Sequence, residues 1–258
     1  MQVLKIVKIG GNIIDDDQAL YSFLKQFSKL QGPKLLVHGG GKLATNLAQK
    51  MGVKVQMIDG RRVTDSDTLD IAVMVYAGKI NKTIVAQLQA NQCNAIGFSG
   101  ADGNTIISEK RPIEPTNFGF VGDIVKVNTA VLELLISNTI TPVFCAITHN
   151  EKGQLLNTNA DTIASELAIA FAKIYQTELY YCFEKNGVLK DINDKLSVIK
   201  NINATNVQQL IQDKVIADGM LPKIKNCMHA IQQNVNKVCI GKPEMLFRPD
   251  ANFTSITK

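Results

Sequence analysis

The 258-residue chain lacks any apolar run long enough to cross a membrane, and it has no low-complexity segment. Its longest uninterrupted apolar run, Ile71 to Ala77, is far shorter than the roughly 20 residues that a membrane-spanning helix needs. The N-terminus shows no basic stretch followed by a long apolar one, so we expect a cytoplasmic protein without a signal peptide. The chain has 45% hydrophobic and 20% charged residues, which is typical of a globular protein. Its length fits one large domain or two lobes.

Cysteine is scarce, and charge of one sign is not concentrated anywhere. The cysteines are odd in number, widely spaced and without a C-x-x-C pair: Cys93, Cys145, Cys182, Cys227 and Cys239. This pattern excludes a disulfide framework and a zinc site, so we expect reduced cysteines and no metal cluster. The 28 basic and 23 acidic residues give a net charge of +5 without any long basic run. Small anions are therefore expected as partners rather than nucleic acid.

Short apolar runs alternate with amphipathic stretches along the chain. The expected strands cover residues 3–9, 34–37, 53–58, 94–98, 141–145, 178–183 and 237–240. The expected helices cover residues 18–30, 43–51, 66–90, 128–137, 161–174, 205–213 and 222–233. This alternation predicts an α/β fold in which helices cover both faces of a mostly parallel sheet. Residues 104–127 break the pattern with prolines and glycines, as a hairpin over a site would.

Two glycine-rich turns follow expected strands. Lys8-Ile9-Gly10-Gly11 ends the first strand, where backbone N–H groups can approach an anion closely. His38-Gly39-Gly40-Gly41 precedes a helix, and its glycines favour a backbone cradle for a carboxylate or a phosphate. The second turn is not a phosphate-binding Walker A loop, because Leu36 and Leu43 occupy the positions where that motif needs glycine and a hydroxyl residue.

The second turn also matches a dinucleotide-binding pattern, which keeps an NAD-dependent oxidoreductase open as an alternative. Gly39, Gly41 and Ala44 have the required spacing, and Asp59 follows 18 residues after Gly41.

Two further segments place polar residues at expected helix starts. Asn157 and Asn159 precede the helix of residues 161–174, which begins at Asp161, and three polar side chains exceed what capping needs. Lys223 lies in the first turn of another helix, where its charge opposes the helix dipole unless an anion lies nearby. The first segment therefore indicates a site that orients lysines or a substrate, and the second indicates a nearby anion.

Taken in order, these segments resemble the amino acid kinase family, and within it the enzymes that use ATP to phosphorylate the side-chain carboxylate of N-acetyl-L-glutamate in arginine biosynthesis. The matching pieces cover essentially the whole chain: Lys8-x-Gly10-Gly11, His38-Gly39-Gly40-Gly41, Gly60-x-Arg62-Val63-Thr64, Gly119-x-Val121-Gly122, Asn157-x-Asn159-Ala160-Asp161 and Gly219-Met220-x-Pro222-Lys223. The resemblance implies a three-layer α/β/α sandwich. It also implies one domain, residues 1–258, with a substrate lobe in residues 1–170 and a nucleotide lobe in residues 171–258.

The resemblance also assigns roles to individual residues. Lys8, Lys223 and Gly11 would stabilise the phosphoryl group in transfer, and Asp161 would hold the two lysines. The residues implied to bind the amino-acid substrate are Gly40, Gly41, Arg62, Asn157 and Asn159. Those implied to bind ATP are Gly10, Glu184, Lys185, Asn186, Gly187, Val188, Leu189, Val215, Ile216 and Ala217. The accompanying Mg²⁺ would be held largely by phosphate oxygens and water.

The chemistry is coherent with those roles. A glutamate side chain has an ordinary pKa of about 4.3, so the acceptor is already ionised at neutral pH and needs no general base. Catalysis must then come from positioning and from cations and N–H dipoles that offset the repulsion between two anions.

The chain departs from the family pattern near the nucleotide segment. Phe183 and Glu184 stand where the family usually has a small hydroxyl residue followed by Asp, and Asp218 replaces a glycine. This departure keeps a non-catalytic metabolite-binding module open as a further alternative. N-succinyl-L-glutamate is a longer alternative substrate. Arginine-inhibited hexameric members carry a helix before the first strand, whereas here that strand begins near Val3, so we expect a homodimer that arginine does not inhibit.

Overall fold

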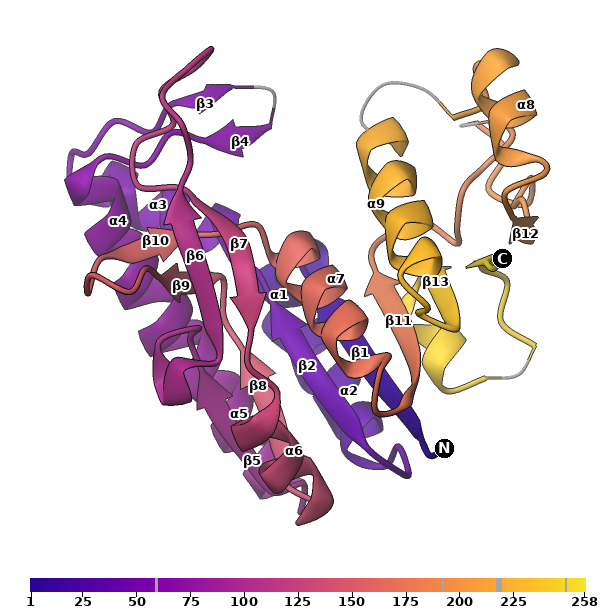
Figure 1. Cartoon of the computed structure of the whole chain (residues 1–258), viewed down its shortest axis with the longest axis horizontal. Coiled ribbons are helices and arrows are strands. Elements are labelled where there is room, and N and C mark those ends of the chain that lie inside the picture. The colour runs from indigo at the N-terminus through magenta and orange to yellow at the C-terminus, as the bar shows by residue number, and fades with distance from the viewer. Residues whose placement is uncertain (59, 192, 217–219, 249) are drawn as a thin grey trace.

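An eight-stranded sheet runs through the centre of the molecule (Figure 1). The computed structural model describes residues 1–58, 60–191, 193–216, 220–248 and 250–258. The strands lie in the order β12-β14-β13-β11-β1-β2-β8-β5, and every neighbouring pair is parallel except β13 and β14. Their bounds are β1 Val3–Ile9, β2 Lys34–His38, β5 Ala95–Phe98, β8 Thr141–Phe144, β11 Gln176–Cys182, β12 Asn201–Ile202, β13 Lys237–Gly241 and β14 Thr254–Ile256.

The central strands are apolar because both faces of the sheet are covered. In β1 the side chains of Leu4 and Ile6 on one face of the sheet and of Val7 and Ile9 on the other are completely buried. A strand of a parallel sheet covered on both sides reads as a nearly continuous hydrophobic run, in contrast to the alternation of a half-exposed strand. The predicted α/β class with a mostly parallel sheet is confirmed.

Helices lie on both faces of this sheet (Figure 1). Their bounds are α1 Asn12–Asp15, α2 Asp17–Ser28, α3 Gly41–Lys50, α4 Ser66–Ala72, α5 Asn81–Ala90, α6 Ala130–Ser137, α7 Ala160–Phe171, α8 Val207–Gln212 and α9 Met220–Gln232, with the 3₁₀ turns η2 Asp102–Asn104 and η3 Pro243–Leu246. Each predicted helix is confirmed. A π-helical segment, η1 Val73–Ile80, joins α4 to α5 inside the predicted helix of residues 66–90. In the described part of the chain, no helix combines the length and apolar character needed to cross a membrane.

A second, four-stranded sheet lies beside the central one. It comprises β10 Leu155–Asn157, β9 Ile147–His149, β6 Ile106–Lys110 and β7 Gly122–Val127. The antiparallel pairing of β6 with β7 confirms the predicted hairpin in residues 104–127.

The expected strand at residues 53–58 is wrong as part of the central sheet. Only β3 Met57–Ile58 is a strand there, and it pairs with β4 Arg61–Arg62 in a separate hairpin. Val53 and Val55 pack against the core, while Lys54 and Gln56 remain exposed. A segment that buries only alternate side chains does not fit a strand covered on both faces.

The topology brings the glycine turns to one edge of the central sheet. β1 and β2 are adjacent and parallel, and their last residues, Ile9 and His38, are register partners. Gly10-Gly11 and Gly39-Gly40-Gly41 therefore follow neighbouring strands at their carboxyl ends, where ligands bind in open α/β sheets.

Candidate active site

Asp161 lies between two lysines that come from distant parts of the chain. Its Oδ1 is 2.8 Å from Nζ of Lys8 at the end of β1, and its Oδ2 is 3.3 Å from Nζ of Lys223 in α9. Tyr181 in β11 donates a hydrogen bond from its hydroxyl to the backbone oxygen of Asp161, at 3.0 Å. The three charged side chains predicted to act together are thus in direct contact.

The two lysines control the charge of Asp161. Burial disfavours the ionised carboxyl, but the adjacent Lys8 and Lys223 outweigh it and lower the pKa of Asp161 to about 2. Asp161 is therefore a carboxylate at neutral pH and holds both ammonium groups by charge. Each lysine keeps about a fifth of its side chain exposed, 16% for Lys8 and 23% for Lys223, so both remain accessible to a ligand.

Two residues that depart from the family pattern also lie near this cluster. The Phe183 ring centroid is 5.5 Å from Nζ of Lys223, and the Tyr181 ring centroid lies at the same distance. Aromatic rings at this distance attract an ammonium group. Glu184 accepts a hydrogen bond from Asn12 Nδ2 at 2.9 Å, which ties the residue after the first glycine turn to the segment after β11.

The glycine turns adopt conformations that favour glycine. Gly11 has φ of 51° and Gly40 has φ of 150°, both at positive values that other residues rarely adopt. A Cβ on Gly40 would stand 2.2 Å from Cδ1 of Ile80, and one on Gly10 would stand 2.7 Å from Nζ of Lys8. Gly40 is also the N-cap of α3 and offers no capping side chain, so the first N–H groups of α3 are left available for an anion.

A cavity of about 850 Å³ opens beside these elements. The predicted site residues among its lining are Gly40, Gly41, Arg62, Asn157, Asn159, Asp161 and Lys223. Its other walls include the hairpin of residues 104–127, through Arg111, Glu114, Phe118 and Val121. The volume is within the range of small-molecule sites.

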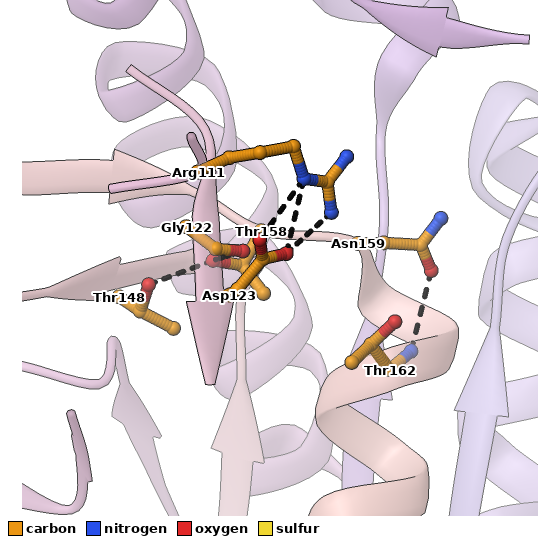
Figure 2. A network of polar contacts seen from close by, with 7 residues as sticks. All are labelled: Arg111, Gly122, Asp123, Thr148, Thr158, Asn159 and Thr162. Atoms are coloured by element: carbon orange, nitrogen blue, oxygen red, sulfur yellow. Dashed lines mark hydrogen bonds and ion pairs between the residues drawn. The ribbon is translucent and has the colours of Figure 1, made fainter. Parts of the chain in front are cut away.

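The polar residues of the cavity are held by specific contacts. Arg62 donates from one terminal nitrogen to the Gly41 backbone oxygen and to Thr45 Oγ1, both at 2.8 Å. Asn157 Nδ2 donates to Thr64 Oγ1 at 3.0 Å. Asn159 caps α7, because its Oδ1 accepts from the backbone N–H of Asp161 at 2.7 Å and from that of Thr162 at 3.3 Å. Figure 2 shows the second of these hydrogen bonds. The helix cap therefore uses the Oδ1 of Asn159.

Sequence reasoning missed the arginine of the hairpin. Arg111 forms an ion pair with Asp123 on β7, and its Nε lies 3.1 Å from each carboxylate oxygen (Figure 2). Its guanidinium carbon is 5.5 Å from the Phe118 ring centroid. The prolines and glycines of residues 104–127 predicted a hairpin over a site, but nothing in the sequence singled out Arg111 within that hairpin.

Tyr76 was missed as well. It is buried in η1 and lines the cavity, and burial raises the pKa of its phenol although the nearby Arg62 acts in the opposite direction. It lies within the apolar run of residues 71–77, so its pattern in the sequence is that of a core residue.

Among the described residues predicted to bind the nucleotide, none lines this cavity. Glu184 to Leu189 follow β11, and the Val188 backbone N–H donates to Thr254 Oγ1 of β14 at 2.8 Å. Val188 and Ile216 are buried, and Val215 packs against the core. Ala217, Asp218 and Gly219 lie outside the described residues, as does Asp59 of the dinucleotide pattern.

Metal-ligand clusters are not found in the described ranges of the chain, which contain no group of three or more His, Cys, Asp or Glu side chains able to hold an ion. The five cysteines are buried and free.

Comparison with known proteins identifies the family of this chain. The model of the amino acid kinase family matches residues 4–242. Acetylglutamate kinase from Cytophaga hutchinsonii is 52% identical over 247 residues, which cover 95% of this chain and 94% of that protein. Acetylglutamate kinase from Phocaeicola vulgatus is 48% identical over 237 residues and 92% of each chain. Among solved structures, smu.665 from Streptococcus mutans UA159 has a TM-score of 0.76 and 24% identity, with 98% of each chain covered, which supports the fold alone. The chain therefore belongs to the amino acid kinase family.

Proposed function

We propose that the protein transfers the γ-phosphoryl group of ATP to the side-chain carboxylate of N-acetyl-L-glutamate, giving N-acetyl-L-glutamyl 5-phosphate in arginine biosynthesis. Two lines of support are the acetylglutamate kinase relatives at 52% and 48% identity over more than nine-tenths of the chain, and the family match. The relatives favour neither the NAD-dependent oxidoreductase nor the non-catalytic binding module.

The observation that carries the proposal is the placement of Asp161 between Lys8 and Lys223. In this role the two ammonium groups face the phosphoryl group in transfer and offset the repulsion between the phosphate and the attacking carboxylate. Asp161 stays ionised and fixes their positions, so the lysines need little reorganisation when the substrates bind. Backbone N–H groups of Gly11, Gly40 and Gly41 add dipoles aimed at the same oxygens.

The cavity suits the amino-acid substrate. Arg62 carries a planar guanidinium that can bind a carboxylate through two N–H groups, and Asn157 offers an amide beside it. We assign Gly40, Gly41, Arg62, Asn157 and Asn159 to this substrate, within a substrate lobe of residues 1–170.

The nucleotide is assigned to the second lobe, residues 171–258. Its proposed contacts are Gly10 from the first lobe, Glu184 to Leu189, and Val215 to Ala217. Mg²⁺ is assigned to phosphate oxygens and water because no acidic cluster lies among the described residues. When bound, it would neutralise part of the phosphate charge.

The test is acyl-phosphate formation with Mg·ATP, trapped by hydroxylamine. N-acetyl-L-glutamate, N-succinyl-L-glutamate, L-glutamate and L-aspartate are assayed side by side. Turnover with N-acetyl-L-glutamate and at least about a 100-fold lower kcat/KM with the free amino acids supports the proposal, because those lack the acyl group that the site must hold. Preference for the succinyl compound or silence with all four would contradict it.

We further propose a cytoplasmic homodimer that arginine does not inhibit. Exposed apolar side chains on the edge strand β5 and on α6, namely Ile96, Val131 and Leu134, suit the contact between two copies. Sedimentation at micromolar concentration should give twice the 28.2 kDa of one chain. A monomer, a hexamer or inhibition by millimolar arginine would contradict this part.

A further inference from the structure

A buried histidine-asparagine pair lies directly behind the second glycine turn. The side chains of His38, at the end of β2, and Asn81, at the start of α5, are almost completely enclosed, with 0% and 1% exposed. Nδ1 of His38 lies 2.9 Å from the backbone oxygen of Gly39. Nδ2 of Asn81 lies 3.1 Å from Nε2 of His38 and 2.9 Å from the Val143 backbone oxygen. Neither side chain lines the cavity, so the proposed chemistry does not use either of them.

These contacts fix the proton position on His38. The amide nitrogen of asparagine can only donate, and a backbone oxygen can only accept. One N–H of Asn81 therefore points to Val143 and the other to Nε2 of His38, while Oδ1 of Asn81 accepts from Lys82 Nζ at 3.2 Å. Nε2 is then an acceptor, so a neutral imidazole carries its proton on Nδ1 and donates it to the Gly39 oxygen.

The Gly39 oxygen belongs to the same peptide unit as the Gly40 N–H. In a trans peptide these two groups point in opposite directions. Because the imidazole holds the Gly39 oxygen, the Gly40 N–H is turned away from the buried ring. Gly39, Gly40 and Gly41 all line the cavity, so this peptide unit lies between the buried ring and the cavity.

The π-helical segment η1 packs against this turn and presents Asn81 to it. The close approach of Gly40 to Ile80 and to the Tyr76 ring leaves no room for a side chain on Gly40. In a π-helix the hydrogen bonds join residues five apart, which brings residues 76 and 81 to nearly the same side. Gly97 in β5 leaves space for the asparagine, since a Cβ there would stand 1.8 Å from Asn81 Oδ1. Such π segments are rare and occur often at functional sites.

We propose that His38 is a positioning residue, which Asn81 holds in the Nδ1–H form so that it anchors the Gly39-Gly40 peptide with the Gly40 N–H facing the transferred phosphoryl group. The proposal rests on the proposed kinase activity for its kinetic consequence. Its structural content, the proton position and the anchored peptide, can be measured without turnover.

The kinetic test compares two amides that replace the ring at different nitrogens. The amide nitrogen of asparagine falls close to the position of Nδ1, whereas that of glutamine falls close to the position of Nε2. His38→Asn therefore keeps a donor toward Gly39, and His38→Gln loses it. We expect His38→Gln to lower kcat about 10-fold or more with the KM for N-acetyl-L-glutamate within about twofold, because a misdirected N–H weakens transition-state binding. His38→Asn should keep most of the wild-type kcat. Equal losses in the two variants, or none in either, would overturn the proposal.

A second pair of variants tests the support from Asn81 without altering the histidine. Gly97→Ala forces Asn81 away and should lower kcat as His38→Gln does. Gly78→Ala is the matched control, because Gly78 lies in the π segment that precedes Asn81 and a Cβ there meets nothing within 4 Å. Circular dichroism checks that both variants are folded. If the folded Gly97→Ala variant has the same kcat as Gly78→Ala, the role of Asn81 is contradicted.

The proton position is tested by ¹⁵N nuclear magnetic resonance on the ligand-free protein, which has only three histidines to assign. His38 should show a protonated Nδ1 and an unprotonated Nε2 at pH 7, and the Nδ1 proton should correlate with the Gly39 carbonyl. The opposite tautomer or an imidazolium would overturn the inference even in an active enzyme. If the wild-type protein shows the expected tautomer but no turnover, the proposed function fails and the anchored peptide stands.

Discussion

At the scale of single residues, the contact between Lys8 and Asp161 is the one most directly tied to phosphoryl transfer. Lys8→Ala removes one of the two ammonium groups held by Asp161 and should lower kcat roughly 100-fold or more, the usual consequence of losing one aimed donor to a transition-state anion. The measurement is kcat in the hydroxylamine assay. Lys5→Ala is the control, because Lys5 lies three residues away on β1 and points to the opposite face of the sheet. Wild-type kcat in Lys8→Ala would remove Lys8 from the mechanism.

The protonation of His38 should limit stability in acid. Burial is the largest cause that lowers its pKa from 6.5 to about 4; the hydrogen bond to Gly39 opposes the shift and the positive charge of Lys82 adds to it. Because the unfolded chain binds a proton at a higher pH than the folded one, the contribution of neutral His38 is complete above about pH 6.5. As pH falls toward 4 this contribution is lost, which lowers the free energy of unfolding by roughly 3 kcal/mol.

Urea unfolding of the wild type and of His38→Asn from pH 7 to pH 4 measures this contribution. The wild type should lose more free energy of unfolding than the variant across that window, since asparagine does not titrate. Parallel curves would show that His38 is not a buried neutral group.

At the scale of secondary-structure elements, a buried lysine closes the C-terminus of α2. Lys34 at the start of β2 donates to the backbone oxygens of Phe27, Ser28 and Leu30 at 2.8 to 2.9 Å. Phe27 and Ser28 are the last two residues of α2 and Leu30 follows its C-cap, so the ammonium group binds carbonyls at the helix end, where a cation also complements the helix dipole. Burial lowers the pKa of Lys34, yet the ammonium form is the one that can donate three hydrogen bonds.

Lys34→Met should therefore lower the free energy of unfolding by about 2 to 3 kcal/mol, because buried carbonyls lose charged hydrogen-bond donors. Chemical denaturation measures the change. Lys29→Met at the exposed C-cap of the same helix should change stability by less than about 0.5 kcal/mol. Equal effects of the two substitutions would mean that the three hydrogen bonds do not stabilise the helix end.

The elements differ in how well the sequence predicts them, for physical reasons. The long amphipathic helices and the apolar strands of the central sheet follow from their periodicity, as β1 illustrates. The edge strand β12 and its neighbour β14 have two and three residues, too few to show any period. The π-helical turn in η1 depends on the packing of Tyr76 and Ile80 against Gly40, and that contact exists only once β2 and α3 are in place.

The same distinction applies to the candidate site. Lys8, Asp161 and Lys223 each lie in a recognisable sequence motif, and the fold brings both lysines within ion-pair distance of Asp161. Arg111 and Tyr76 lie in no such motif. In the sequence alone, an arginine in a hairpin and a tyrosine in an apolar run do not indicate a functional site. Their place beside the cavity results from tertiary contacts, Arg111 with Asp123 and Tyr76 with the glycine turn. Neither contact has a signature in local sequence.

At the scale of the whole molecule, the proposed division near residue 170 predicts that the two ligands can be lost separately. A ligand that binds the folded state raises the free energy of unfolding, by about 2.7 kcal/mol at 100 times its Kd, and the unfolding temperature rises with it. Arg62→Ala should abolish the thermal shift caused by N-acetyl-L-glutamate and keep the shift caused by Mg·ATP. Arg62 lies on the cavity wall, and its hydrogen bonds go to Gly41 and Thr45 of the first lobe.

Gly187→Ala should have the reciprocal effect. A Cβ on Gly187 would stand 2.6 Å from Thr254 Oγ1 and 2.9 Å from Val198 Cγ1, so the segment of residues 184–189 must move. The Mg·ATP shift should then fall while the N-acetyl-L-glutamate shift remains, each measured against the ligand-free unfolding temperature of the same variant. If each variant loses the thermal shifts caused by both ligands, the two ligands bind at one shared site and not in two separate lobes. Retention of the Mg·ATP shift in Gly187→Ala would remove residues 184–189 from the nucleotide site.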